Sequence, residues 1–142
     1  MRTVSSAIAE VNQNSTTAGI VAVMAATLAE KLRITEGRTV RLMRAPDRHL
    51  PMLGPFTPGE DTADVVLLYS RSREQLVRDA ATAIAAVAAG GVLWVCYPKK
   101  SAGTPSDLSR ESCRDLIAAH GWRPVAQVAI DDVWSAMRFR PA

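Results

Sequence analysis

Two apolar runs decide the fold, Asp64-Val65-Val66-Leu67-Leu68-Tyr69 and Val92-Leu93-Trp94-Val95-Cys96-Tyr97. Each run has the length of a strand and shows no alternation of apolar with polar side chains. Strands of this kind are covered on both faces, as in a parallel sheet with helices on either side. We therefore expect two strands in the interior of such a sheet.

The segment between the two runs predicts a helix. Ser72 and Gln75 have the spacing of an N-terminal capping box. Four apolar residues then recur on one helical face: Leu76, Ala80, Ile84 and Val87. Gly90-Gly91 is expected to end this helix, because glycine adopts the left-handed conformation of a helix terminus without strain. A strand–helix–strand unit of this kind makes a right-handed crossover between parallel strands.

Upstream of this unit the sequence predicts fewer regular elements. Residues 1–16 are small and polar and are expected to form a loose arm. Residues 17–32 have the apolar spacing of a helix, and Thr39 to Arg44 has the pattern of a short strand. The connection from Ala45 to Thr62 is rich in proline, and one helical turn is expected over Asp47–Leu53.

Downstream, Thr104 is expected to cap a helix that ends at His120-Gly121, with Asp107 facing its positive end. A strand over Val125–Ile130, a tight turn at Asp131-Asp132 and a last, alternating strand follow. Residues 17–142 are thus predicted to form one α/β domain, a small, open, mostly parallel sheet of about five strands with a C-terminal antiparallel strand.

Composition excludes several classes of protein. The chain has 142 residues, of which 48% are apolar and 22% charged, so a disordered or fibrous chain is not expected. The longest apolar run, Ala18 to Ala29, is too short to span a bilayer. With two cysteines and two histidines and no metal-binding spacing among them, neither a disulfide framework nor a metal site is expected, and a cytosolic location is predicted. Phosphate-loop and hydrolase-elbow motifs are also missing.

The order of the last six elements resembles the second half of the S-adenosylmethionine-dependent methyltransferase fold, a Rossmann-like fold. The segment Ala88-Ala89-Gly90-Gly91-Val92-Leu93-Trp94-Val95 and the turn at Gly121-Trp122 carry this resemblance. Other stretches are similar to a family of short bacterial proteins, the domain of unknown function 3052. They are Leu28–Leu32, Ala63–Leu68, Tyr97–Ser101, Ser106–Leu108 and Asp131–Ser135. The resemblance implies a truncated methyltransferase-like fold.

This sequence departs from the methyltransferase pattern in two places. Methyltransferases of that superfamily have a glycine-rich turn after the first strand and an acidic residue at the end of the second, which binds the cofactor ribose. Here the first strand runs into Arg44-Ala45-Pro46-Asp47 without a glycine, and the second and third strands are expected to be absent. No cofactor is therefore predicted, and methyl transfer is the least favoured function.

Ligands of open parallel sheets bind beyond the carboxyl ends of the strands. Eight residues that the topology brings to this rim are candidate ligand-binding residues: Tyr69, Arg71, Lys99, Lys100, Ser101, Asp131, Asp132 and Trp134. Lys99, Lys100 and Ser101 precede a predicted helix and form either an anion site or a solvated loop whose lysine pairs with an aspartate.

The other candidates have two interpretations each. Asp131 and Asp132 form either an acid–base pair or, as the commoner case, a turn. Trp134 and Tyr69 either contact a ligand or fill the layer between sheet and helix, which we favour.

His49 has no visible partner in the sequence. Arg138 and Arg140 share a face of the last strand, taken as an edge strand. Without interleaved aromatic side chains they are interpreted as solvated rather than as a nucleic-acid site.

Two functions follow from these patterns. The favoured one is a small cytosolic binding or accessory domain, not an enzyme, that binds an anionic small molecule or a protein at the rim. The alternative is a cofactor-independent enzyme with Asp132 as its base and Lys99 as the stabiliser of a developing negative charge. The helix predicted over residues 17–32 is expected either to dock on the sheet or to pair with a second copy in a homodimer.

Overall fold

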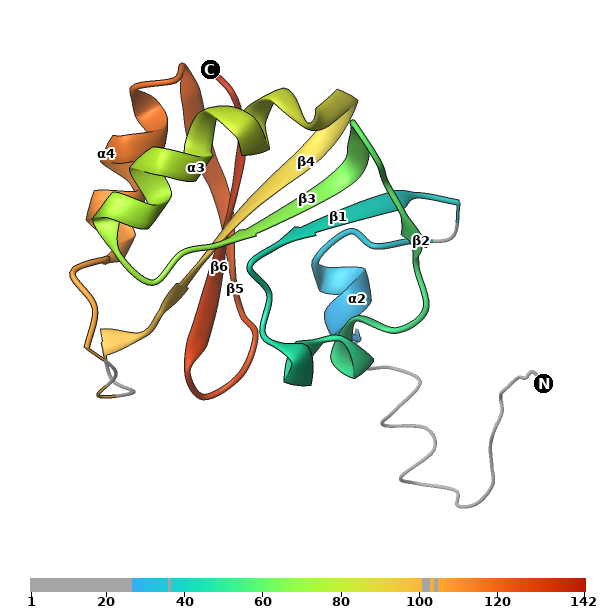
Figure 1. The fold of residues 1–142 in the computed structure, drawn as a ribbon, viewed down its shortest axis with the longest axis horizontal. Coiled ribbons are helices and arrows are strands. Elements are labelled where there is room, and N and C mark those ends of the chain that lie inside the picture. The colour runs from blue at the N-terminus through green and yellow to red at the C-terminus, as the bar shows by residue number, and fades with distance from the viewer. Residues whose placement is uncertain (1–26, 36, 101–102, 104) are drawn as a thin grey trace.

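The computed structural model describes residues 27–35, 37–100, 103 and 105–142 (Figure 1). They form one six-stranded sheet with the strand order β2-β1-β3-β4-β6-β5. The strands are β1 (Thr39–Met43), β2 (Thr57–Pro58), β3 (Ala63–Tyr69), β4 (Val87–Pro98), β5 (Trp122–Ala129) and β6 (Trp134–Pro141). The first four are parallel, and β6 is antiparallel to both β4 and β5. The prediction of a mostly parallel α/β sheet with a C-terminal antiparallel strand is confirmed.

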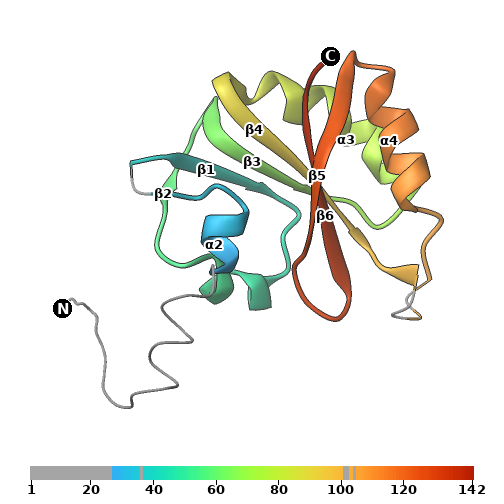
Figure 2. The ribbon, with the colours of Figure 1, turned by 180° about the vertical axis from the view of Figure 1, so that it is seen from behind.

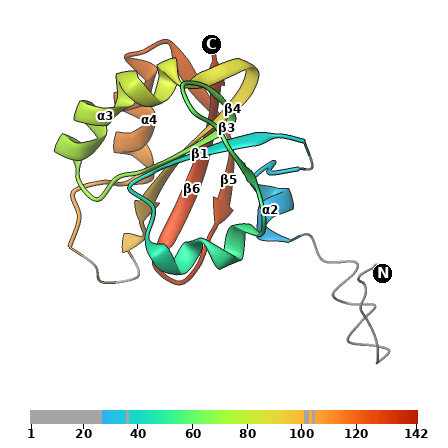
Figure 3. The ribbon, with the colours of Figure 1, turned by 45° about the vertical axis from the view of Figure 1, so that its right-hand side comes forward.

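Helical elements cover both faces of the sheet. The helices α3 (Arg73–Ala85) and α4 (Arg110–Ala118) lie on one face, and the short helix α2 (Leu28–Lys31) lies on the other (Figures 2 and 3). Two 3₁₀ turns, η1 (Asp47–His49) and η2 (Pro51–Leu53), lie on the side of α2. None of the helices in these parts of the chain is long and apolar enough to cross a membrane.

The two faces of β3 explain its unbroken apolar sequence. Val66 and Leu68 pack with α3 and α4 in one hydrophobic cluster, which we call the first core. Val65, Leu67 and Tyr69 pack on the opposite side, with residues of α2 and η2, in the second core. Because successive side chains of a strand point to opposite faces, a strand buried on both sides needs apolar residues at every position.

The predicted boundary between α3 and β4 is wrong. The helix ends at Ala85, and Val87 pairs with Ala63 as the first residue of β4. Gly90 lies within β4 at φ 75°, beside a register shift between β3 and β4. A Cβ atom on Gly91 would lie 2.8 Å from the carbonyl oxygen of Asp64. The glycine pair therefore serves an irregular strand start and a close backbone approach, not a helix terminus.

The predicted start of α4 is also wrong. Its N-cap is Ser109, whose hydroxyl accepts a hydrogen bond from the backbone N–H of Ser112. Asp107 instead accepts one from the backbone N–H of Arg73 at 2.8 Å, so its carboxylate caps the N-terminus of α3. Helix α4 ends at Ala118, and His120 is exposed in the turn that follows. A carboxylate stabilises the positive N-terminal end of any helix that it contacts, so Asp107 can act on α3 rather than on α4.

The order of the C-terminal strands differs from expectation as well. β6 lies between β4 and β5, so Arg138 and Arg140 lie on an interior strand, and β5 is the edge. A second strand was not expected, but β2 pairs with Thr39 and Val40 of β1. The helical turn predicted over Asp47–Leu53 is present as η1 and η2.

The N-terminal predictions fall mostly outside the described residues. The arm over residues 1–16 and most of the helix over residues 17–32 lie there. Within the described residues, a helix boundary lies at Thr27, which has extended backbone at ψ 163° and caps the start of α2 with its side chain. The helix predicted over residues 17–32 is therefore not continuous through Thr27.

Candidate functional site at the carboxyl rim

The carboxyl ends of β3 and β4 meet the turn between β5 and β6 at one rim of the sheet. The ring centroids of Tyr69 and Trp134 are 5.1 Å apart, and the Arg71 guanidinium lies 5.0 Å from the centre of the Trp134 ring. The backbone N–H of Lys99 donates to the Val133 carbonyl at 2.6 Å. The topology thus brings residues from three segments together, as expected from the sequence.

The centre of this rim is His49, a residue for which the sequence showed no partner. Its imidazole is fully buried and joins two of the predicted rim residues. Nδ1 lies 2.8 Å from the Tyr69 hydroxyl, and Nε2 lies 2.7 Å from Oδ2 of Asp131. The side chains of Tyr69, His49 and Asp131 therefore form a continuous hydrogen-bonded chain, which we call the rim triad.

The protonation states within the rim triad follow from its electrostatics. Burial acts to raise the pKa of Asp131, but hydrogen bonds from His49, from the backbone N–H groups of Trp134 and Val133 and from Arg48 outweigh it, lowering the pKa to about 2. Asp131 is therefore an ionised acceptor, and His49 Nε2–H donates to it. Burial also raises the pKa of Tyr69 well above its ordinary value, so its hydroxyl stays protonated and donates to His49 Nδ1.

The two aspartates of the turn have different roles. Oδ1 of Asp131 accepts from the backbone N–H groups of Val133 and Trp134 at 2.8 and 2.7 Å, which fixes the turn. The turn interpretation is right for Asp131, but its charge is paired with His49 and Arg48 rather than with a lysine. Asp132 is exposed, and within the described segments its side chain forms no hydrogen bond. Its predicted role as a base has no geometric support, because it contacts no other reactive group.

The lysine segment is placed at the rim without a built anion site. Lys99 is half-buried and Lys100 is exposed, and Ser101 lies outside the described residues. No ion pair between residues that the structure describes includes either lysine. The helix expected directly after them begins only at Arg110, so its N-terminus is not adjacent in sequence.

Two arginines supply positive charge beside the rim triad. Arg48 contacts Oδ2 of Asp131 at 3.3 Å, and its side chain is 57% exposed. Arg71 is also exposed and covers one face of Trp134. Ser70, which follows Tyr69, is fully buried, and its hydroxyl has no hydrogen-bond partner in the described part of the chain. Exposed cations next to buried polar groups are suited to an anionic, polar ligand.

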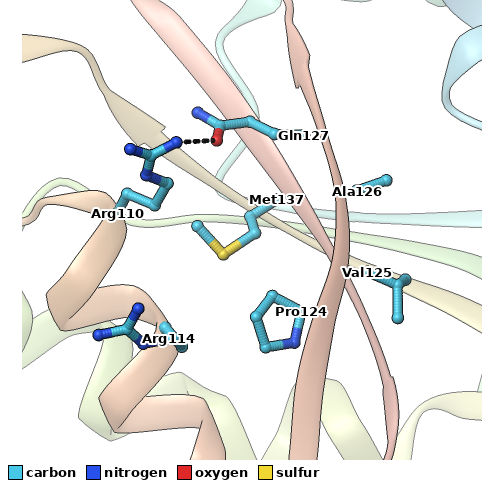
Figure 4. Close-up of a pocket in the computed structure, with 7 residues that line it drawn as sticks. All are labelled: Arg110, Arg114, Pro124, Val125, Ala126, Gln127 and Met137. Atoms are coloured by element: carbon cyan, nitrogen blue, oxygen red, sulfur yellow. Dashed lines mark hydrogen bonds between the residues drawn. The ribbon is translucent and has the colours of Figure 1, made fainter.

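A cavity of about 320 Å³ lies away from this rim, between α4 and the edge strand β5. Figure 4 shows the side chain of Arg110, on α4, reaching toward Gln127 of β5, with Met137 and Pro124 beside it. Arg110 donates to the side-chain oxygen of Gln127 at 3.4 Å, and Gln127 donates to the Tyr97 hydroxyl at 3.0 Å. No sequence pattern indicated this cavity, because the residues that line it come from segments far apart in the chain.

Metal and thiol chemistry find no support at the described positions. Within residues 27–35, 37–100, 103 and 105–142, no three His, Cys, Asp or Glu side chains are arranged to hold a metal ion. Cys96 and Cys113 are both buried free thiols. Burial raises the pKa of Cys113 to about 12, so this side chain is a thiol at neutral pH.

The fold matches solved structures of methyltransferases. Ribosomal protein L11 methylase from Lactobacillus delbrueckii subsp. bulgaricus aligns with a TM-score of 0.50 and 7% identity over 80% of this chain and 74% of its own. The CcbJ methyltransferase from Streptomyces caelestis aligns with a TM-score of 0.52 and 9% identity, over 82% and 88% of the two chains. The chain has the methyltransferase-like Rossmann fold. No family model matches the chain, and no curated protein matches its sequence, so the similarity to the bacterial family stays a prediction.

These structures contradict the favoured functional prediction. A binding or accessory domain that is not an enzyme was expected because the sequence lacked a recognisable catalytic motif. Both of these solved structures are methyltransferases, which are enzymes. Sequence reasoning judged the reactive groups by their spacing along the chain. His49 and Asp131 of the rim triad are 82 positions apart in the chain, so no local sequence motif indicates their contact.

The residues present do not form the cofactor site that the fold implies. The turn after β1 has Arg44 at φ 62° in place of a glycine, and its side chain pairs with Asp79. β2 pairs only with the first residues of β1, and the chain returns from it directly to the start of β3. The acidic residues after β2, Glu60 and Asp61, therefore lie toward the amino ends of the strands, away from the carboxyl rim. At the carboxyl end of β3, His49 packs against Tyr69. S-adenosylmethionine would have neither its glycine turn nor its ribose-binding acid here.

Proposed function

We propose that the protein is an enzyme of the methyltransferase fold that transfers protons to or from an anionic substrate at the carboxyl rim. The observation that carries this proposal is the rim triad, in which His49 bridges the Tyr69 hydroxyl and the Asp131 carboxylate. A hydroxyl hydrogen-bonded to an imidazole that a carboxylate orients is the arrangement of acid–base catalysis.

Each member of the triad has one task in this reaction. Tyr69 is fully buried, so the substrate reaches it only after displacing the exposed side chains of Arg48 and Arg71, and the Tyr69 oxygen then takes the substrate proton as it gives up its own. His49 Nδ1 accepts the hydroxyl proton of Tyr69, and the resulting imidazolium keeps both of its N–H groups hydrogen-bonded. Asp131 fixes the imidazole through Nε2 and stabilises the imidazolium, because its pKa of about 2 keeps it ionised.

The charged surroundings favour an anionic substrate. Arg48 and Arg71 are exposed cations at the rim, where Arg48 contacts Asp131 and Arg71 lies over the Trp134 ring. Arg48 holds Asp131 through one long contact of 3.3 Å, which a substrate anion can replace at small cost, because exposed ion pairs contribute about 0–1 kcal/mol. A phosphorylated or carboxylated small molecule matches this charge.

Proton transfer can be tested by hydrogen–deuterium exchange in a set of phosphorylated and carboxylated metabolites. The purified protein is incubated with the set in D₂O, and mass spectrometry detects exchange at carbon. We expect the native protein to label at least one compound, and Tyr69→Phe, His49→Asn and Asp131→Asn to lose this activity. Asp132→Asn is the matched control and should keep it.

Two results would overturn the proposal. Labelling that persists in Tyr69→Phe would show that the rim triad is not the reactive group, and so would a complete lack of labelling by the native protein. A parallel incubation with S-adenosylmethionine tests the neighbours' reaction, because a methylated product formed only in its presence would replace proton transfer by methyl transfer. ¹⁵N NMR of His49 gives an independent check, since the triad requires the proton on Nε2.

A further inference from the structure

A second group of positive charges lies at the opposite end of the sheet, where β4 begins and β6 ends. Arg138 pairs with Trp94 of β4, and Arg140 pairs with Arg123 of β5. Residues two apart on a strand share a face, and directly paired residues share it too. Arg123, Arg138 and Arg140 therefore lie on one face of the β5–β6 hairpin.

This arrangement is electrostatically unfavourable within the described part of the chain. None of the ion pairs formed there includes Arg123, Arg138 or Arg140. Burial lowers the pKa of Arg138, and the charges of Arg33 and Arg140 lower it further. Like charges on directly opposed strand positions destabilise a sheet. A counter-charge at this place would remove the repulsion.

Arg138 also has an unused hydrogen-bond donor. Its guanidinium carbon lies 6.0 Å from the centre of the Trp94 ring, and the indole N–H of Trp94 donates to the Leu32 carbonyl at 2.8 Å. The Nε atom of Arg138 is buried and has no hydrogen-bond partner among the residues that the structure describes. A buried donor without an acceptor is uncommon in a native protein, and binding of an ion or ligand is one of its ordinary explanations.

A cavity lies beside Arg138. It has a volume of about 240 Å³ and is lined by Gly91, Val92, Val125, Arg138, Phe139 and Arg140. We call it the Arg138 cavity. Its size suits a small ion or a phosphate group rather than a drug-sized molecule, for which pockets of about 300–1,000 Å³ are usual. The lining thus includes two arginines, Arg138 and Arg140, and a glycine, Gly91.

We propose that the Arg138 cavity binds a small phosphate-type oxyanion, with Arg138 and Arg140 as its ligands. The oxygen atoms of the anion accept hydrogen bonds from the N–H groups of Arg138 and Arg140, and its charge compensates the arginines. Guanidinium groups bind such oxyanions through paired N–H donors. This site is separate from the rim triad, because Arg138 pairs with Trp94 and the cavity extends back along β4 to Gly91, whereas Trp134 pairs with Pro98 at the carboxyl end of β4.

Isothermal titration calorimetry of the full chain with inorganic pyrophosphate tests this proposal at constant ionic strength. We expect saturable binding with one site per chain and at least a tenfold loss of affinity in Arg138→Gln, about the effect of one charge-assisted hydrogen bond. Arg78→Gln is the matched control, because Arg78 is an exposed arginine of α3 that pairs with Glu74. It should bind pyrophosphate as the native protein does.

The stability of the variant gives a second measurement. Without pyrophosphate, Arg138→Gln should be at least as stable as the native chain, because it removes an uncompensated charge from the hairpin. Pyrophosphate should raise the melting temperature of the native chain and not that of the variant. Equal affinities in the native chain and in Arg138→Gln would overturn the proposal. A single-stranded oligonucleotide that binds through these arginines while pyrophosphate does not would overturn it as well, in favour of a nucleic-acid surface.

Discussion

At the scale of single residues, Asp131 differs from Asp132 in the number of donors that its carboxylate accepts. The hydrogen bonds of the folded state lower its pKa from 3.8 to about 2, so folding favours the ionised form. This contribution is fully present above the ordinary pKa and is lost as the pH falls through about 2. A shift of this size corresponds to about 2 kcal/mol.

We therefore expect the free energy of unfolding of the native protein to fall, between pH 5 and pH 2, by about 2 kcal/mol more than that of Asp131→Asn. Urea denaturation at a series of pH values measures this difference. Asp132→Asn should follow the native pH dependence, because its exposed carboxylate has no comparable set of donors. Parallel pH profiles for the native protein and Asp131→Asn would contradict the assignment.

The sequence could identify Asp131 as a turn residue but not as a member of the rim triad. A turn is a local pattern, and aspartate at its start is a common signal. The contact with His49 depends on how the proline-rich connection folds back over the end of β3, and that path is set by tertiary packing. The topological rule placed Tyr69, Arg71 and Trp134 at one rim because it concerns strand ends, whereas His49 lies in a 3₁₀ turn.

At the scale of elements, the proline-rich connection is part of the core rather than a loose loop. Leu53 of η2 is fully buried in the second core, whereas its neighbour Met52 is 39% exposed. Leu53→Ala should lower the free energy of unfolding by about 2–5 kcal/mol, because it removes buried contacts and leaves a cavity. Met52→Ala is the adjacent control and should change it by less than about 0.5 kcal/mol. Urea denaturation of both variants tests this, and equal effects would mean that η2 does not pack on the sheet.

The start of α4 can be tested in the same way. Ser109 caps the helix through its hydroxyl, so Ser109→Ala should cost about 1 kcal/mol of stability. Thr82→Ala, at an exposed position inside α3, is the control and should be neutral or slightly stabilising. Thermal unfolding followed by circular dichroism measures both. A neutral Ser109→Ala would place the helix start elsewhere.

Helix boundaries were the least predictable feature of the fold, for an identifiable reason. Thr104-Pro105 and Gly90-Gly91 are both strong local signals for a helix end. The chain uses Gly90 and Gly91 inside β4, where the backbone of Asp64 approaches closely, and it begins α4 only at Arg110. The buried strands were predictable because an apolar run covered on two faces leaves few alternatives, whereas a turn signal fits several structures.

At the scale of the whole molecule, the two cores lie on opposite faces of the same strands. The first core contains α3 and α4, and the second contains α2 and η2. Both depend on β3 and β4, whose side chains point alternately into one core and the other. Loss of either core should therefore disrupt the other, and the described domain is expected to unfold in one cooperative transition.

Tryptophan positions allow this cooperativity to be measured. Trp94 and Trp134 lie in the second core, and Trp122 packs against the first. In Trp122→Phe, fluorescence reports the second core alone, while the far-ultraviolet circular dichroism signal comes mainly from α3 and α4. We expect the two urea transitions of this variant to coincide. Adding Leu76→Ala, in the first core, should lower both midpoints together by an amount equivalent to about 2–5 kcal/mol. A fluorescence midpoint that stays unchanged would mean that the two faces of the sheet unfold independently.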